Sequence, residues 1–120
     1  MFESLRARLD RLLQSHTGPD PRARAAALRE AVLEAKVGVS TMRSALAATE
    51  RELAVEQRQL VDAERRKRLA GDVPDPETMA VAERFIVRHR DRVSVLERKL
   101  VVQRDELTLA EREAAEILDE

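Results

Sequence analysis

Two long stretches of this chain carry apolar residues at alternating spacings of four and three. In each stretch, nine of the eleven such positions are apolar. A period of about 3.5 residues sustained over so many turns is typical of a coiled-coil seam rather than of an ordinary amphipathic helix. The sequence therefore predicts two long helices, each with one packing stripe. The first seam is Leu28, Val32, Ala35, Val39, Met42, Leu46, Thr49, Leu53, Glu56, Leu60 and Ala63, and the second is Ala82, Ile86, His89, Val93, Leu96, Leu100, Gln103, Leu107, Ala110, Ala114 and Ile117.

Prolines occur in only two short segments, which divide the chain. Each segment ends in an Asp-Pro pair, at Asp20-Pro21 and Asp75-Pro76. An aspartate before a helix accepts hydrogen bonds from the free amides of the first turn, and proline is tolerated at the first helical position. Gly71 can supply the left-handed conformation that closes the preceding helix. The expected elements are a leader helix at 1–16, a linker at 17–21, helices at 22–70 and 77–118, and a turn at 71–76.

The two seams have equal length and are joined by a short turn, so the chain is expected to fold back on itself. The predicted fold class is all-α, with a short amphipathic N-terminal helix and a long antiparallel coiled-coil hairpin over residues 22–120. In this pairing the numbers of facing seam residues add up to 142 or 149. Leu53 and Leu60 then lie against residues 82–96, and Val32 lies against residues 110–117.

Two polar residues interrupt the seams at neighbouring levels. Glu56 and His89 fall in adjacent layers in either register. We therefore expect a contact or a water bridge between them that fixes the register, which is the best-attested use of buried polar groups in coiled coils. The alternative is that Glu56 keeps its stem on the seam and extends its carboxylate to Arg88, Arg92 or another nearby arginine.

The leader helix is amphipathic. Large apolar residues recur on one face at spacings of three and four, and arginines occupy its flanks and polar side. This pattern is typical of a helix that lies in a membrane interface, with arginines near anionic headgroups. The alternative is that the same face docks on the hairpin as a third helix. The candidate membrane-binding residues are Phe2, Leu5, Arg6, Arg8, Leu9, Arg11, Leu12 and Leu13.

The turn end of the hairpin is rich in basic residues, which we call the basic tip. Such a cluster can contact phosphates of a lipid or a nucleic acid, although a run of charges is more often a solvated face. Nucleic-acid binding is not favoured, because the region lacks the several aromatic side chains on which bases stack. The residues of the basic tip are Arg65, Arg66, Lys67, Arg68, Arg84 and Arg88.

Composition excludes several classes of protein. The chain has 120 residues, a net charge of −1, no cysteine, and only two histidines. Disulfides and thiolate metal sites are therefore absent, and no histidine belongs to a recognisable metal-ligand motif. We expect no catalytic residues, no metal and no cofactor. No apolar stretch approaches the roughly 18 residues that cross a bilayer.

Many large apolar residues lie outside the two seams. A hairpin of two helices would leave most of them in water, which favours self-association, as a homo-oligomer, or a helical protein partner. These residues are Leu33, Val37, Val55, Val61, Leu69, Val81, Phe85, Val95, Val101, Val102, Leu109 and Leu118.

The order of these parts resembles the phage-shock protein A family, the bacterial ESCRT-III-like membrane remodellers. The matching features are the start Met1-Phe2-Glu3-Ser4-Leu5, the break at Asp20-Pro21, the stretch from Leu28 to Glu34, and a hairpin turn near Gly71. The resemblance implies membrane binding through residues 2–13 and a role in envelope stress. Family members continue into further helices that lock subunits into polymers, so this chain resembles a short form.

The expected function is therefore that of a self-associating, peripheral membrane protein at the cytoplasmic face of the membrane, with anionic lipid as its surface. The alternative is a coiled-coil adaptor or stalk that binds a protein partner, as export-chaperone-like hairpins do. The two differ in whether residues 1–16 bind lipid.

Overall fold

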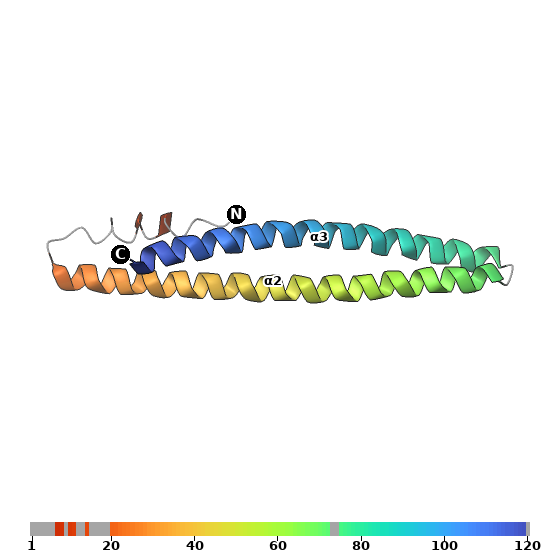
Figure 1. Cartoon of the computed structure of the whole chain (residues 1–120), viewed down its shortest axis with the longest axis horizontal. Helices are drawn as coiled ribbons and strands as arrows, with labels where there is room; N and C mark the ends of the chain where they lie inside the picture. Colours follow the sequence, from red (N-terminus) through yellow and green to blue (C-terminus); the bar gives the residue numbers. More distant parts are fainter. Residues whose placement is uncertain (1–6, 9, 12–13, 15–19, 73–74, 120) are drawn as a thin grey trace. The chain divides into compact units, whose positions relative to one another are not determined.

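The computed structural model consists of two long helices. It describes residues 7–8, 10–11, 14, 20–72 and 75–119. Helix α2 spans Pro21–Asp72 and helix α3 spans Pro76–Asp119, and no strand occurs among the described residues (Figure 1). The prediction of an all-α helical hairpin is confirmed. Most of the predicted leader helix lies outside the described residues.

Both helices begin at the predicted Asp-Pro pairs. The Asp20 carboxylate accepts a hydrogen bond from the Arg22 amide at 3.0 Å. The Asp75 carboxylate accepts one from the Thr78 amide at 3.2 Å and a second from the Thr78 hydroxyl at 2.5 Å. These bonds satisfy amides that have no partner within the helix, so each aspartate fixes the first turn of the helix that follows it.

The end of α2 differs from the prediction. The helix continues through Gly71 to Asp72, two residues beyond the expected end, and no glycine in the described part of the chain has a positive φ. Gly71 therefore does not close the helix in a left-handed conformation. The stop comes from Pro74, since the residue before a proline is disfavoured in the α conformation. Val73 precedes that proline, and α2 ends just before it.

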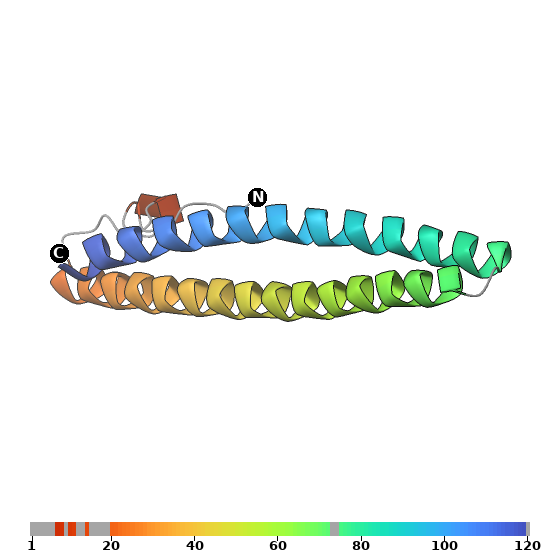
Figure 2. The ribbon, with the colours of Figure 1, turned by 45° about the vertical axis from the view of Figure 1, so that its right-hand side comes forward.

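The packed residues form two compact units, each built from both helices and described here by itself. In the unit that contains residues 20–45 and 103–119, five residues make a buried cluster, and Val32 packs against it as the register predicts. Figure 2 shows the orange part of α2 beside the blue part of α3 in this unit. Most members of this cluster are alanines. The buried cluster is Ala31, Ala35, Val39, Ala110 and Ile117.

The start of the first seam is a correction to the sequence prediction. Leu28 was expected to face α3, but it is 37% exposed, whereas Ala27 and Ala31 are 2% and 4% exposed. The buried positions 27, 31, 35 and 39 are spaced by four. Each step of four turns an α-helix about 40° past a full turn. The packing stripe therefore moves round α2 toward its beginning and leaves Leu28 at the edge.

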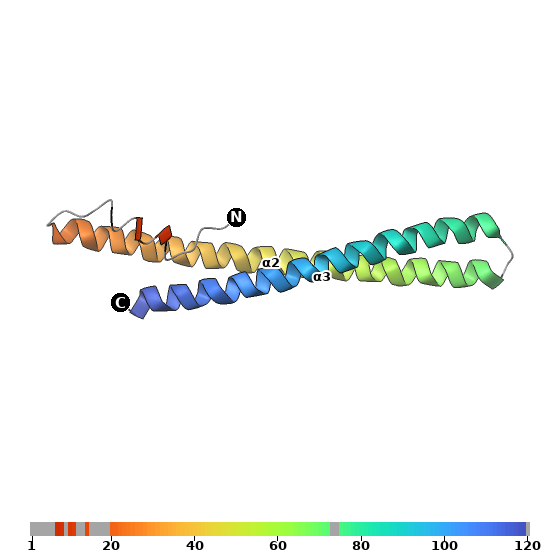
Figure 3. The same ribbon diagram turned by 90° about the horizontal axis from the view of Figure 1, so that it is seen from above.

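The second unit comprises residues 46–102 and contains the hairpin turn. Figure 3 shows the green part of α2 running antiparallel to the teal part of α3 in this unit. Leu96 and Thr49 are the most deeply buried side chains, at 1% and 2% exposed. Apart from Ala70, the buried residues of this unit lie on the two predicted seams, and Leu53 and Leu60 are half-buried. The other buried residues of this unit are Ala63, Ala70, Ala82, Ile86 and Leu100.

Candidate functional site

A polar contact joins the two helices of the second unit. His89 Nδ1 on α3 lies 2.7 Å from Glu56 Oε2 on α2, and the two side chains are 19% and 21% exposed. The predicted contact between these residues is therefore present as a direct hydrogen bond. The alternative partners for Glu56 are engaged elsewhere, because Arg92 lies 3.7 Å from Glu52 and Arg88 lies over an aromatic ring.

Phe85 extends this polar contact into a small aromatic and cationic cluster. Its ring stacks on His89 with centroids 6.3 Å apart and an interplanar angle of 14°. The guanidinium carbon of Arg88 lies 5.7 Å from the Phe85 centroid, which is within the range of a cation–π interaction. Phe85 is nevertheless 46% exposed. The Phe85 ring therefore packs on both His89 and Arg88 while Phe85 itself stays accessible.

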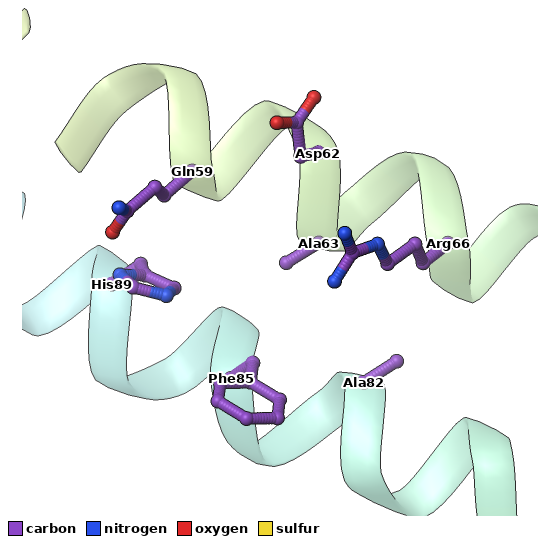
Figure 4. Close-up of a pocket in the computed structure, with 7 residues that line it drawn as sticks. All are labelled: Gln59, Asp62, Ala63, Arg66, Ala82, Phe85 and His89. Carbon is purple, nitrogen blue, oxygen red and sulfur yellow. The ribbon is translucent and has the colours of Figure 1, made fainter. Parts of the chain in front are cut away.

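A pocket of about 320 Å³ lies beside this cluster, between the two helices of the second unit. Figure 4 shows the Arg66 guanidinium reaching into the space between the helices, with Phe85 and His89 on the opposite helix. A guanidinium and an aromatic ring on facing walls can hold a small planar or acidic group. The lining residues are Gln59, Asp62, Ala63 and Arg66 from α2, and Ala82, Phe85 and His89 from α3.

The basic tip does not form an uninterrupted cationic surface. Lys67 forms an ion pair with Glu83 at 3.0 Å, and Arg90 forms one with Glu64 at 3.7 Å. Arg88 lies on Phe85, and Arg66 lines the pocket. Arg65, Arg68 and Arg84 are exposed on the surface of the two helices. Acidic residues are thus interleaved with the basic ones, and they reduce the attraction that this end can exert on phosphates.

The leader residues can be followed only in part. Phe2, Leu5, Arg6, Leu9, Leu12 and Leu13 lie outside the described residues. Arg8 and Arg11 are described and have helical backbones, with Arg8 half-buried and Arg11 exposed. The prediction of membrane contact through this segment stays a prediction.

The pocket is the feature that sequence reasoning missed. Its walls combine seam residues with residues one position beside the seam, and Phe85 was considered only as one of many exposed apolar side chains. The sequence feature that could have indicated it is the spacing of Phe85, Arg88 and His89 by three and four residues, which places them on one side of a helix.

No helix in the described ranges is long and apolar enough to cross a membrane. Among the same residues, no group of three or more histidine, aspartate or glutamate side chains could hold a metal ion. Comparison with protein-family models, with curated proteins and with solved structures finds no match for this chain. Its function must therefore be inferred from its own residues.

Proposed function

We propose that this protein is a self-associating scaffold without catalytic activity that binds anionic membrane surfaces through residues 2–13. Its physiological role would be membrane maintenance or envelope stress, as in the phage-shock protein A family that the sequence resembles. The observation that carries the proposal is the amphipathic sequence pattern of the leader, whose spacing would bring Phe2, Leu5, Leu9, Leu12 and Leu13 to one face of a helix.

The energetics favour binding by many leaders at once. A fully buried large apolar side chain contributes about 1.5–3 kcal/mol, but a membrane interface buries it only partly. Ordering the segment into a helix consumes some of that gain. One leader should therefore bind modestly, whereas an oligomer that presents several leaders gains from the high effective concentration of each after the first has bound.

The exposed surface of the hairpin supports the self-association part of the proposal. Fourteen large hydrophobic side chains of the described residues are more than a third exposed. Leu33 at 65%, Val37 at 61% and Val101 at 58% are among the most exposed. Single exposed hydrophobics are ordinary on protein surfaces, but so many on two helices favour contact with further helices.

The test is the substitution Leu9→Glu. It places a charge in the apolar face, so co-sedimentation with vesicles containing anionic lipid should be lost. The hairpin's helicity and melting temperature should stay nearly unchanged. Gln14→Glu adds the same charge on the polar face of the leader and is the matched control, which should bind almost as well as the wild type. Binding by the wild type should weaken as salt is added, because the arginines are then screened from the headgroups.

The same substitution separates the proposal from the adaptor alternative, which the exposed apolar side chains of α2 and α3 also favour. If Leu9→Glu lowers the melting temperature of the whole protein, the leader is a third helix docked on the hairpin. The membrane proposal is then wrong, and a helical protein partner becomes the better explanation of the exposed surface.

A further inference from the structure

One face of α3 points away from α2 and combines apolar side chains with ordered charges. Val87, Ser94 and Val101 are seven residues apart, which places them on one line along the helix. We call these three residues the outer row. Val87 is 50% exposed, Val101 is 58% exposed, and Ser94 is exposed as well. Each follows a seam residue directly, so the row is turned by about 100° from the line that packs on α2.

Charged residues of alternating sign flank the outer row on both sides. Asp91 and Arg98 follow one edge, and Arg90 and Glu97 follow the other. All four are exposed. Arg90 reaches Glu64 on α2, whereas Asp91, Glu97 and Arg98 have no ion-pair partner within the described part of the chain. The hairpin itself therefore makes little use of this charge pattern.

The pattern is complementary to itself when α3 meets an antiparallel copy of α3. If the two-fold axis passes at Ser94, Val87 faces Val101 of the second copy. At the same register Asp91 faces Arg98, and Arg90 faces Glu97. A two-fold axis repeats each of these contacts, so the apolar row and both charged edges are satisfied together.

Charge distinguishes among the other arrangements of the same two helices. In a parallel pairing in register each edge faces the opposite edge of the second copy, so Asp91 lies beside Arg90 and Arg98 beside Glu97. The single reversals would not rescue one another in that arrangement, so the mixing experiment below distinguishes the two directions. An antiparallel pairing that slips by seven residues brings Asp91 onto Asp91, and Arg90 onto Arg90 along the other edge. Like charges in contact oppose association, so the alternation selects the register of the antiparallel pair.

We propose that the outer row of α3 is a homotypic interface, at which two copies of this protein pair antiparallel about Ser94. The proposal rests on the self-association included in the proposed function and names the surface that carries it. Val87 and Val101 supply the apolar contact, and Val95 and Val102 lie beside them at the rim. The four charges determine which partner and which register are accepted.

The test uses two single charge reversals. Asp91→Arg places arginine against Arg98, and Arg98→Asp places aspartate against Asp91. Each variant alone should self-associate at least tenfold more weakly than the wild type in sedimentation velocity over a concentration series. An equimolar mixture of the two should recover the association, because arginine then faces aspartate at both positions.

Two further variants control for folding and for net charge. Asp91→Arg combined with Arg98→Asp in one chain restores the complementary pairing and should associate as the wild type does. Glu30→Arg makes the same change of charge on an exposed residue of α2 and should leave association unchanged. Circular dichroism of each variant verifies that the helices are retained.

The outcomes distinguish this interface from the proposed function. If the wild type associates and the single reversals do not weaken it, or if mixing them restores nothing, the outer row is not the interface. Self-association and membrane binding then stand unaffected. If the wild type is monomeric at every concentration, both the interface and the self-association are wrong, while the vesicle experiment still decides membrane binding separately.

Discussion

Removing either member of the Glu56–His89 pair should destabilise the hairpin, whereas replacing both with leucine should not. The 2.7 Å contact lies on the seam, where both neighbouring layers are apolar. A single Glu56→Leu change leaves the His89 ring nitrogen without its carboxylate, and a single His89→Leu change leaves the carboxylate without a donor. A buried polar group that loses its partner costs about 1–3 kcal/mol.

The expected loss of stability in each single variant follows from the partial burial of Glu56 and His89. The two side chains are 19% and 21% exposed, so water can reach the orphaned group and the loss should be near the lower limit, about 1 kcal/mol. The double leucine variant leaves no orphan and adds apolar contact at two seam positions. Replacement of a buried polar pair by apolar residues is often neutral or stabilising, by about 1–4 kcal/mol. We therefore expect the double variant to melt above the wild type.

The assay is a double-mutant cycle measured by urea unfolding at one fixed protein concentration, since association would otherwise change the apparent stability. The coupling between Glu56 and His89 should be about 1 kcal/mol, within the range found for contacting residues. Glu52 and Arg92 provide a matched cycle. They lie 3.7 Å apart with side chains 51% and 54% exposed, and exposed pairs contribute about 0.2–1 kcal/mol. Their coupling should be the smaller of the two.

The effect of the Glu56–His89 pair on the register can be measured separately from its effect on stability. If the polar pair fixes the register, the double leucine variant should show a broader distribution of oligomers than the wild type in sedimentation velocity. A coupling energy of zero would show that the two side chains do not stabilise one another. An unchanged distribution in the double variant would show that the contact does not determine the register.

The remaining predictions concern the seam and the cap of α3. Leu100 is 5% exposed, so Leu100→Ala should lower the free energy of unfolding by about 2–5 kcal/mol, and Leu60→Ala, at a half-buried position, should lower it less. Asp75→Ala should lower the melting temperature, because the first turn of α3 loses its cap. The hydrogen bonds from the Thr78 side chain and amide hold the pKa of Asp75 below its ordinary value of 3.8. The cap's contribution is thus complete at neutral pH and is lost as the pH falls through that lowered pKa, so Asp75→Ala should flatten the acid limb of a stability–pH curve.

Most of the fold follows from local rules that a sequence displays directly. Asp20 and Asp75 start their helices because the capping geometry depends on only a few consecutive residues. The second seam is buried or half-buried at every position, since a regular repeat defines one face of α3 whichever residue occupies each position. The contact between Glu56 and His89 could be predicted because two seams of equal length, joined by a short turn, allow only neighbouring registers.

The features that the sequence did not predict depend on packing, which a sequence repeat does not encode. Ala27 is buried in place of Leu28 because the packing stripe turns round α2 toward its beginning, and a strict repeat does not show where the stripe changes its line. The pocket at Arg66 and Phe85 also depends on side-chain directions across two helices. The charged edges of the outer row were also not recognised from the sequence. They can be assigned to an outward face only after the seam of α3 is known to pack on α2.

The proposed roles of the leader and of the outer row both rely on charge, so salt should act on both in the same direction. In these proposals the leader's arginines attract anionic headgroups, and the α3 charges attract those of a second copy. Both attractions cross water and are screened within about 8–10 Å at ordinary ionic strength. The two seams are held by apolar burial, which salt does not screen and which excluded salts strengthen. Rising ionic strength should thus release the protein from vesicles and from itself while its helices remain paired. A loss of helicity in parallel with release would mean instead that association holds the hairpin together.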